Sequence, residues 1–449
     1  MPGTSSPETI STRLQRIAEL AQEAPDRVLT TLHHHIDLEW LGEAYRRTRK
    51  DGAVGVDGQT AESYAADLEG NLRSLLDRFK SGSYRAQPVR RVYLPKGDGR
   101  KTRPIGVPAF EDKVLQRAVA MVMEPIYEQE FHDCSYGFRP GRSAHQALQE
   151  LWMRLTQWRG GWVLELDIQA FFDTIEYGHL RSFLDRRVRD GVLRRTIDKW
   201  LAAGVLEQGA VSRPESGTPQ GGVISPLLAN IYLHEVLDRW FHEQIQPLLE
   251  RSAFLLRFAD DAVLCFQSEV DARRVLAVLP KRFARFGLTL HPEKTRLIRF
   301  QRPSSRPGGD PLPSKDGPGT FDLLGFTHYW ARSRQRWWVI RRRTAKDRLR
   351  RALQRIAGWC RDHRHRPVRW QHGELVRKVS GHMAYYGITG NVAQLGRFVY
   401  RVGRLWHMWL CRRGRSSRMN WDRFNLLLQR YPLPRVRIVH QYSRQAANP

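Results

Sequence analysis

The stretch LLRFADDAVL, residues 255–264, places two adjacent carboxylates, Asp260 and Asp261, between two short apolar runs. The flanking runs, 255–258 and 262–266, are typical of the two strands of a hairpin, with the Asp-Asp pair as its tight turn. Two like charges about 4 Å apart repel by roughly 4 kcal/mol at the effective dielectric near a protein surface. Solvation of both side chains in an ordinary turn is one interpretation. The other is a site for Mg²⁺ or Mn²⁺, which requires a third carboxylate.

The best candidate for the third carboxylate is Asp167. It interrupts the apolar run GWVLELDIQAFFDTI, residues 161–175, which predicts a buried strand. An ionised carboxylate is expensive to bury there without a counter-charge. We therefore expect Asp167, Asp260 and Asp261 to share one cation site, with Asp260 the stronger candidate of the pair because neighbours on a strand face opposite ways. Two metal ions held in this way activate an attacking 3′ hydroxyl and stabilise a departing pyrophosphate, the chemistry of a nucleotidyl transferase.

The charge of the chain is concentrated near its C-terminus. The 449 residues carry a net charge of +28, and this length predicts two or three domains. Residues 331–449 contain 29 Lys and Arg against four acids, a net charge of +25, whereas residues 1–330 carry a net charge of only +3. This distribution predicts a polyanionic partner for the C-terminal part. We place a domain boundary at about 330–340.

Composition also argues against several classes of protein. No apolar run approaches the length that spans a bilayer, and the N-terminus lacks the apolar core of a signal peptide. The four cysteines are widely separated and form neither a zinc-ligand pattern nor a disulfide framework. We therefore expect a soluble intracellular protein with no membrane partner.

Local patterns predict both helices and strands. Helical spacing covers 8–50 and continues to about Phe79 after the glycine-punctuated loop 51–58. Residues 89–108 are typical of a hairpin around a Gly-Asp-Gly turn. Ser143 predicts the start of a helix, and the Pro/Gly/Ser-rich segment 301–319 predicts an exposed loop.

Several longer motifs together resemble those of reverse transcriptases. FADD, LDIQAFFDTI, GTPQGGVISPLLANIYLHEVLD, GLTLHPEKTRL and FDLLGF occur in the order and approximate spacing of that family, and SYGFRPGRSAHQAL and RKTRPIGVPAFEDKVLQRAV are similar to enzymes encoded within bacterial group II introns. The resemblance implies an α+β right-hand polymerase whose fingers and palm have mixed α/β structure. The implied segments are an N-terminal helical extension (1–76), the reverse transcriptase fingers and palm (77–330) and a basic helical thumb/maturase domain (331–449).

The resemblance also implies a role for single residues. Asp167, Asp260 and Asp261 would hold two Mg²⁺ ions, with Mn²⁺ as an alternative, and the backbone carbonyl of Ile168 would add a ligand. Phe172 matches the aromatic gate that excludes a 2′ hydroxyl, although core packing is an alternative role for it.

Other motif positions would bind nucleotide and primer. Lys96 and Arg103 match residues that grip the incoming triphosphate, to which both side chains make charge-assisted contacts. Gln220 resembles a residue of the nucleotide pocket, Lys294 one near the departing pyrophosphate, and Asp173 a supporting group. Leu324, Gly325 and Phe326 resemble the turn that grips the primer end. In one departure Phe258 stands where the family most often has tyrosine, which leaves both carboxylates in place.

The C-terminal part resembles the maturase domain of group II intron proteins, which helps the intron RNA to fold and splice. The resemblance rests on GHMAYYGITGN and WLCRRGRSSRMNWDRFNLLLQRYPLPRVRIVH, and half of the 14 tryptophans lie among the basic residues of 331–449. Aromatic rings and Arg planes of this kind are available to stack on unpaired bases. No counterpart of an HNH endonuclease is present, which is similar to the compact class of these proteins.

The leading hypothesis is an RNA-directed DNA polymerase that also promotes intron splicing and mobility. Its implied partners are group II intron RNA, an RNA template with a DNA or RNA primer, dNTPs and target DNA, in a cytoplasmic bacterial ribonucleoprotein; the sequence leaves the oligomeric state open. One alternative is a defence- or CRISPR-associated reverse transcriptase without a splicing role. The other is a non-enzymatic RNA-binding maturase.

Overall fold

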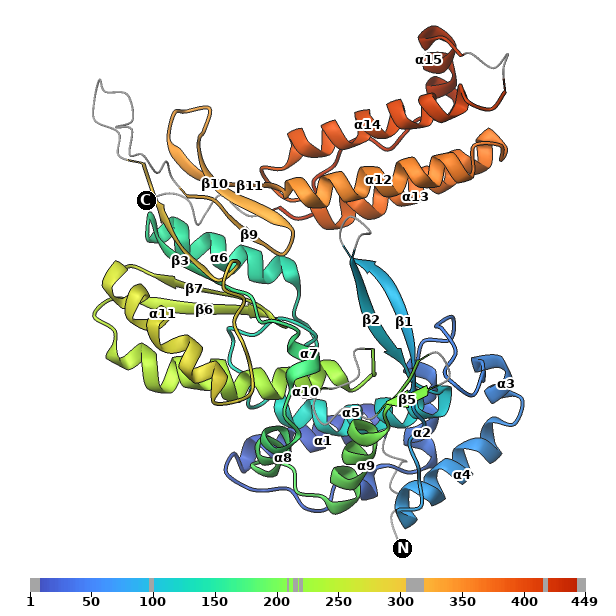
Figure 1. The fold of residues 1–449 in the computed structure, drawn as a ribbon, viewed down its shortest axis with the longest axis vertical. Coiled ribbons are helices and arrows are strands. Elements are labelled where there is room, and N and C mark those ends of the chain that lie inside the picture. Colours follow the sequence, from blue (N-terminus) through green and yellow to red (C-terminus); the bar gives the residue numbers. More distant parts are fainter. Residues whose placement is uncertain are drawn as a thin grey trace, which may run out of the picture. The chain divides into compact units, whose positions relative to one another are not determined.

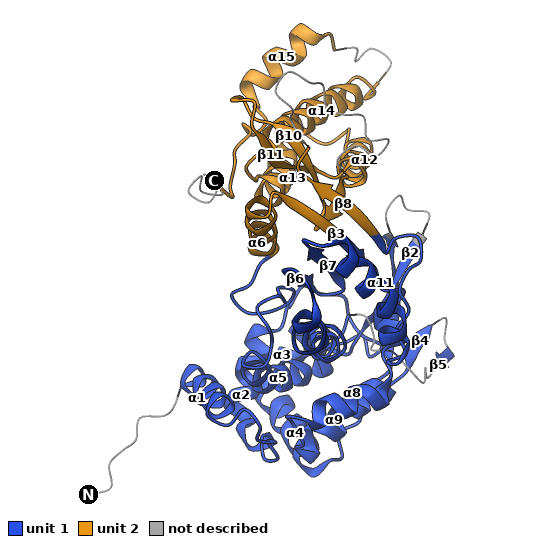
Figure 2. Ribbon diagram, turned by 90° about the vertical axis from the view of Figure 1, so that its left-hand side faces the viewer, with its two compact units in different colours: residues 1–143, 164–296 blue, residues 144–163, 297–449 orange. Residues whose placement is uncertain are grey.

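The computed structural model describes residues 9–96, 101–207, 210–212, 217, 221–303, 319–414 and 419–441 (Figure 1). Contacts divide the chain into two compact units, coloured separately in Figure 2. The first unit is Met1–Ser143 with Leu164–Arg296, and the second is Ala144–Val163 with Leu297–Pro449. Each unit therefore combines two stretches that are separate in the sequence.

The first unit opens with helices whose N-termini are capped by side chains. Each cap accepts a hydrogen bond from a backbone N–H of the first turn, which satisfies a donor that has no helical partner. These caps are Thr9, Asp37, Thr60 and Asp67. Trp40 is fully buried and donates its indole N–H to the carbonyl of Ala118 (2.9 Å), which fixes α2 against α5. The capped helices are α1 (Ile10–Glu23), α2 (Leu38–Arg47), α3 (Ala61–Ala65) and α4 (Leu68–Ser81), and α5 (Phe110–Tyr127) follows without a side-chain cap.

A twisted hairpin follows in the position that the sequence predicts. Strands β1 (Val89–Lys96) and β2 (Lys101–Val107) pair antiparallel, and the Gly-Asp-Gly turn lies outside the described residues. Strand β4 (Val205–Glu207) pairs in parallel with β1, and β5 (Ala210–Ser212) pairs antiparallel with β4. The resulting sheet has the order β2-β1-β4-β5.

A second four-stranded sheet carries the acidic motifs. Its order is β6-β7-β3-β8, from β6 (Ala253–Phe258), β7 (Asp261–Phe266), β3 (Gly160–Leu166) and β8 (Arg296–Gln301). Strands β6 and β7 are buried along almost their whole length, as expected of strands covered on both faces. The helices of this part are α7 (Phe171–Thr174), α8 (Tyr177–Asp185), α9 (Gly191–Ala202), α10 (Ser225–Leu233) and α11 (Glu269–Ala284). Beyond α10 the helix continues with π-helical turns at His234–Asp238 and Trp240–Ile245.

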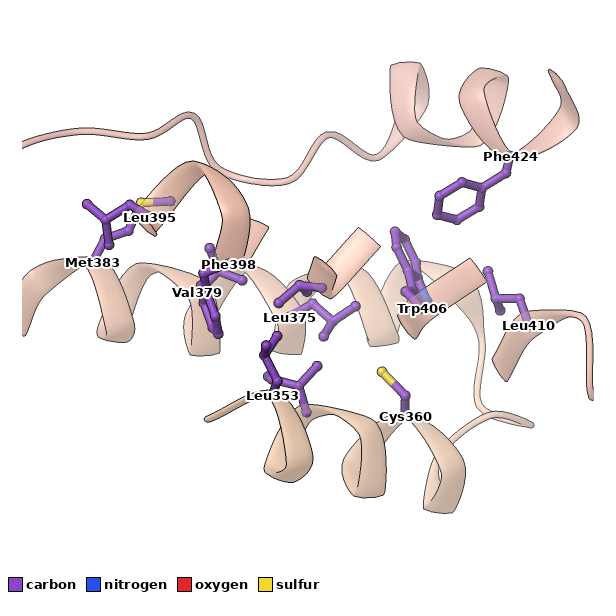
Figure 3. Packing of buried hydrophobic residues seen from close by; sticks show 12 residues of the cluster. Leu353, Cys360, Leu375, Val379, Met383, Leu395, Phe398, Trp406, Leu410 and Phe424 are labelled. Carbon is purple, nitrogen blue, oxygen red and sulfur yellow. The ribbon is translucent and has the colours of Figure 1, made fainter. Parts of the chain in front are cut away.

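The second unit combines a three-stranded sheet with long helices. Strands β9 (Phe321–Leu323), β10 (Phe326–Arg332) and β11 (Trp338–Thr344) form a sheet in the order β11-β10-β9. Its helices are α6 (Ala144–Gln157), α12 (Lys346–Asp362), α13 (Val368–Tyr386), α14 (Val392–Leu410) and α15 (Trp421–Arg430). Leu353, Leu375, Phe398 and Trp406 are among the residues that form their shared core (Figure 3). The sequence pattern at Leu349, Leu353 and Ile356 predicts this bundle.

The α+β fold class predicted from the sequence is confirmed. Helices occupy the predicted ranges within 8–50 and up to Phe79, and α6 begins directly after Ser143. Most of the predicted loop 301–319 lies outside the described residues, and the segments 1–76, 77–330 and 331–449 stay a prediction. Across the described ranges, no helix combines the length and apolar character needed to cross a membrane.

A buried carboxyl group makes the stability of the first unit depend on pH. Asp112 on α5 accepts hydrogen bonds from the Tyr84 hydroxyl and from the backbone N–H of Gln87 (3.3 Å). Burial raises the pKa of Asp112 to about 7. The folded protein therefore keeps a proton that the unfolded chain, with an ordinary Asp pKa near 4, releases. Stability falls as the pH rises between these two values.

We predict that Asp112→Asn removes this pH dependence, because the amide stays neutral. Urea unfolding at pH 5 and pH 7.5 measures it: the free energy of unfolding should fall with pH in the wild type and fall less in the variant. An equal fall in both proteins would contradict the assignment. Asp198→Asn, at a partly exposed position of α9 where the carboxylate pairs with Arg181, is the matched control.

Candidate active site

The Asp-Asp motif lies at the end of the β6–β7 hairpin. Phe258 pairs with Asp261, so the two-residue turn is Ala259-Asp260. Ala259 adopts a left-handed φ of 57°. The prediction that Asp260 and Asp261 both form the turn is wrong by one residue: Asp261 is the first residue of β7. Asp260 is half-buried and Asp261 is exposed.

Asp167 directly follows β3, the strand next to β7 in the sheet. Ile168 forms an antiparallel bridge with Leu290. Two backbone hydrogen bonds flank this bridge: the N–H of His291 donates to the carbonyl of Asp167 (2.8 Å), and the N–H of Gln169 donates to the carbonyl of Thr289 (2.8 Å). The carbonyl of Ile168 takes no part in this pair of bonds, and alternation along a strand directs it away from Leu290. That orientation is compatible with a role as a metal ligand.

Lys294 lies at the carboxylate of Asp167. Its Nζ is 3.2 Å from Oδ1 and 3.1 Å from Oδ2, and both side chains are partly exposed. An exposed pair of this kind contributes little to stability. The pair does place a movable positive charge beside the first of the predicted catalytic carboxylates, in the same unit as Asp260 and Asp261.

The donor set suits a hard divalent cation. Three carboxylates and a backbone carbonyl are the oxygen ligands that Mg²⁺ and Mn²⁺ prefer. Within the described ranges, however, no three His, Cys, Asp or Glu residues are grouped so that they could hold a metal ion. The ligand set Asp167, Ile168, Asp260 and Asp261 therefore fits by its chemistry and stays a prediction.

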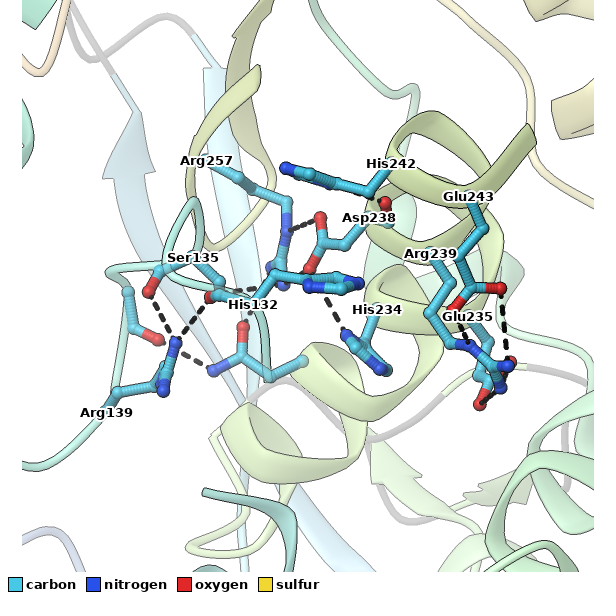
Figure 4. Close-up of polar contacts among 12 residues, drawn as sticks. His132, Ser135, Arg139, His234, Glu235, Asp238, Arg239, His242, Glu243 and Arg257 are labelled. Carbon is cyan, nitrogen blue, oxygen red and sulfur yellow. Dashed lines mark hydrogen bonds and ion pairs between the residues drawn. The ribbon is translucent and has the colours of Figure 1, made fainter. Parts of the chain in front are cut away.

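A fully buried arginine lies behind the Ala259-Asp260 turn (Figure 4). Arg257 Nε and Nη2 bind the two oxygens of Asp238 (2.8 and 2.6 Å) in a bidentate ion pair. Nη1 donates to the Asn230 side chain (2.9 Å) and to the carbonyl of Ala259 (3.1 Å), and Nη2 also donates to Ser135 Oγ (2.8 Å). An arginine has five N–H donors, and these five bonds use all of them.

The same network shapes the local electrostatics. Burial raises the pKa of the Asp238 carboxyl, but Arg257 and His234 together lower it more, so that the pKa lies well below its ordinary value. Burial lowers the pKa of Arg257, whereas the charges of Asp238 and Asp260 raise it, and the net shift is upward. Asp260 thus interacts with a buried positive charge. This guanidinium offsets part of the repulsion within the Asp-Asp pair.

Close backbone packing and three histidines complete the surroundings of this network. A side chain at Gly137 would collide with the backbone N of Ala259, so this loop approaches the turn only because residue 137 is glycine. His242 Nδ1 lies 2.9 Å from the Asp238 carbonyl, and the ring of His132 stacks on that of His242 with 4.5 Å between centroids. His234 Nδ1 lies 3.8 Å from Asp238 Oδ2.

The predicted nucleotide gate lies on α7. Phe172 is half-buried and packs edge-on against Phe171, with 5.3 Å between ring centroids. The next residue, Asp173, is exposed and is held by its N–H, which donates to the carbonyl of Ala170 (2.7 Å). A Cβ at Gly217 would be 3.0 Å from the carbonyl oxygen of Phe172. The motif around Gln220 therefore begins beside the gate.

The remaining nucleotide-binding candidates lie on or near the β1–β2 hairpin. Arg103 is exposed on β2 and pairs in register with Leu94. Lys96 ends β1, but its side chain lies outside the described residues, as does the whole of Gln220. A Cβ at Gly221 would be 2.5 Å from the carbonyl oxygen of Gly106, so the residue after Gln220 packs against β2.

The predicted primer grip is a tight turn of the second unit. Leu324 and Gly325 have φ values of 50° and 81° and connect β9 to β10, as in a type I′ turn. The Tyr385 hydroxyl donates to the carbonyl of Leu324 (2.8 Å), and the N–H of Ala345 donates to that of Gly325 (3.0 Å). Phe326 is fully buried, so it anchors the turn to the core.

The sequence interpretation missed the partners of the Asp-Asp turn, Arg257, Asp238, Asn230 and Ser135. The available signal was Arg257 itself, a charged residue within an otherwise apolar predicted strand. Such a residue needs a buried counter-charge.

Comparison with known proteins identifies the family. A family model described as reverse transcriptase (RNA-dependent DNA polymerase) matches residues 94–328, more than half of the chain, and the chain belongs to this family. It is similar to the group II intron-encoded protein LtrA of Lactococcus lactis subsp. cremoris, with 38% identity over 303 residues that cover 64% of this chain and 50% of LtrA.

Two further relatives extend this similarity. Protein YkfC of Escherichia coli (strain K12) is 41% identical over 242 residues, 52% of this chain and 63% of that protein. Nuclear intron maturase 2, mitochondrial, of Arabidopsis thaliana is 27% identical over 330 residues, 62% of this chain and 43% of that protein. The chain thus spans about half the length of the curated relatives that it matches. The predicted resemblance to intron-encoded reverse transcriptases is confirmed.

We predict that Arg257→Met destabilises the first unit by about 3–5 kcal/mol, because it leaves the Asp238 carboxylate buried without its partner. The double variant Arg257→Met/Asp238→Leu, which removes both charges, should recover most of that loss. Urea unfolding of the wild type, both single variants and the double variant measures the coupling. Additive losses in the double variant would show that the ion pair is not a unit.

Proposed function

We propose that the protein is an RNA-directed DNA polymerase that uses a two-metal mechanism. The observation that carries the proposal is that three acids lie at the ends of neighbouring strands: Asp167 directly after β3, Asp260 in the turn before β7, and Asp261 as the first residue of β7. Family membership supports the same reaction. The bound pair of Mg²⁺ ions, for which Mn²⁺ can substitute, would lower the pKa of the primer 3′ hydroxyl and neutralise the departing pyrophosphate.

The residues of this chain would hold and select the reactants. Arg103 and Lys96 would bind the triphosphate of a dNTP through charge-assisted hydrogen bonds. Phe172, beside Gly217, would exclude a 2′ hydroxyl, and Gln220 would line the pocket. Lys294, now paired with Asp167, would move to the departing pyrophosphate when the carboxylate binds cation.

The turn 324–326 would hold the primer end. Because the Leu324 and Gly325 carbonyls already accept protein hydrogen bonds, the turn is fixed before the primer binds. Preorganisation of this kind lowers the entropic cost of binding.

The second role that we propose is binding of group II intron RNA to promote splicing and mobility, in the bacterial cytoplasm and with target DNA as a further partner. Similarity to the group II intron-encoded protein LtrA and to the Arabidopsis intron maturase supports it, together with the net charge of +25 over residues 331–449. A reverse transcriptase without a splicing role is the alternative. An intron RNA in the nucleotides that flank the gene distinguishes the two.

We predict that Asp260→Asn lowers cDNA synthesis on an RNA template with a DNA primer by at least about a hundredfold, the scale seen when one charge-stabilising group is lost. RNA affinity, measured by filter binding, should change little, because a carboxylate neutralises no phosphate. Asp198→Asn is the matched control and should polymerise like the wild type. Full activity of Asp260→Asn would refute the metal assignment.

We predict that the triple variant Arg397→Gln/Arg401→Gln/Arg404→Gln binds structured RNA more weakly than the wild type. Its RNA affinity should also depend less steeply on salt concentration. These residues are exposed along α14, and each lost phosphate contact should reduce the slope of log affinity against log salt by about 0.7 to 0.9. Substitution in place is preferable to deletion, because α6 and β10 pack against the C-terminal helices.

The matched control removes the same charge from the first unit: Arg273→Gln/Arg274→Gln/Lys281→Gln, at exposed positions of α11. If both triple variants reduced the slope equally, the second unit would not be the main RNA-binding surface.

A further inference from the structure

The loop between α12 and α13, residues 363–367, is held from beneath by two buried side chains. The two N–H groups of the Gln371 amide, a residue that is 1% exposed, are shared among three carbonyls, those of His363 (3.0 Å), Arg364 (3.0 Å) and Arg366 (2.8 Å). Trp406 fixes that amide by donating from its indole N–H to Gln371 Oε1 (2.9 Å). Three carbonyls of the loop are therefore held by one buried amide.

A guanidinium from another element strengthens this support. Arg413, just after α14, donates to the carbonyls of Arg364 (2.5 Å) and Arg366 (2.6 Å). Carbonyls that accept two strong donors leave a loop with little conformational freedom. This loop is consequently rigid before any ligand binds.

Three aromatic rings cluster beside this loop: Trp359 on α12, His363 in the loop and Trp370 on α13, with 5.4 Å between the centroids of His363 and Trp370 and a tilt of 32°. Trp359 lies 5.0 Å from His363 and 5.8 Å from Trp370 between ring centroids, with interplanar angles of 18° and 24°. Trp359 packs on the hydrophobic core of the second unit, whereas Trp370 is 41% exposed. Trp359 and His363 are partly buried, so Trp370 is the most exposed ring of this cluster.

Positive charge surrounds these rings. Lys378 Nζ lies 5.2 Å from the centroid of the Trp359 ring, and the Arg366 guanidinium lies 5.8 Å from that of Trp370. Arg361 and Arg369 are exposed on the adjoining turns. Two acids lie nearby: Asp362, paired with Arg361 at 2.9 Å, and Glu374, one turn after Trp370 on α13 and paired with Arg377. Exposed aromatic faces bordered by cations complement a ligand that has both a flat ring and phosphates.

We propose that Trp359, His363 and Trp370 form a stacking platform that binds an unpaired base of RNA, with Arg366 and Lys378 on the flanking phosphates. This inference rests on the proposed RNA-binding function, and it names the residues of the second unit that would contact the RNA bases. Base–aromatic stacking tolerates any base, whereas hydrogen bonds between paired bases keep their faces within the duplex. The platform therefore distinguishes RNA with loops or bulges from a continuous duplex.

The test uses the full chain and three probes: an RNA hairpin with an unpaired loop, a blunt RNA duplex of equal phosphate number, and heparin, a polyanion without bases. Trp370→Leu removes the aromatic face but keeps an apolar side chain, and Trp370→Phe keeps a smaller aromatic face. Trp337→Leu, at another exposed tryptophan of the second unit (63% exposed), is the matched control. Circular dichroism and thermal unfolding check that every variant folds.

Trp370→Leu should weaken binding of the looped hairpin by roughly tenfold, the effect of one lost base stack, and leave the duplex and heparin within about twofold. Trp370→Phe should recover most of the loss, and Trp337→Leu should have no such selective effect. Unchanged hairpin binding by a folded Trp370→Leu variant, or an equal loss on all three probes, would overturn the platform. If the wild type bound none of the RNAs, the proposed RNA-binding function itself would fail. Failure of the RNA-binding function can therefore be distinguished from failure of the stacking platform alone.

Discussion

The ion pair between Arg257 and Asp238 is the interaction on which the acidic end of the first unit depends. Two oppositely charged groups removed from water seldom stabilise a fold more than well-packed apolar residues would. The contribution of this ion pair is therefore to fix the positions of the segments that it connects. Its donors reach the π-helical turn after α10, the loop at Ser135 and the carbonyl of Ala259. One guanidinium thus joins three separate segments of the chain and sets the path of the Ala259-Asp260 turn.

The sequence predicts the elements well and the contacts between them less well. The β6–β7 hairpin, the N-terminal helices and β1–β2 follow from periodicity and turn residues. The turn differs by one residue because Ala259 takes a left-handed φ of 57°, a conformation that alanine rarely adopts without tertiary support. That support comes from Arg257 and from the close approach of Gly137, which no local pattern reveals. The pairing of Lys294 with Asp167 likewise depends on contact between segments remote in sequence.

Charge and packing divide the chain at different places. Composition changes at about 330–340, whereas α6 and residues 297–330 belong to the second compact unit. Leu148 on α6 is buried with Phe326 and Ile388, three residues that are remote in the sequence. Charge reports which surface faces a polyanion, and buried apolar contacts report which segments fold together, so the two measures need not agree. The turn at Leu324 and Gly325 belongs to both divisions. Its sequence motif assigns it to the predicted palm segment, whereas its buried contacts assign it to the second compact unit.

Two loops in separate units are stabilised by the same device. Arg257 binds the carbonyl of Ala259 from the buried side of one loop, and Gln371 with Arg413 binds the carbonyls of His363, Arg364 and Arg366 in the other. In each case a buried side chain satisfies backbone acceptors of the loop, and functional candidates lie on or beside the loop: Asp260 and Asp261 at the first, and His363 with Trp359 and Trp370 of the adjoining helices at the second. Groups held in this way lose little conformational entropy when a ligand binds. Rigid support beneath short loops is therefore the feature that links the fold of this reverse transcriptase to its proposed chemistry and RNA binding.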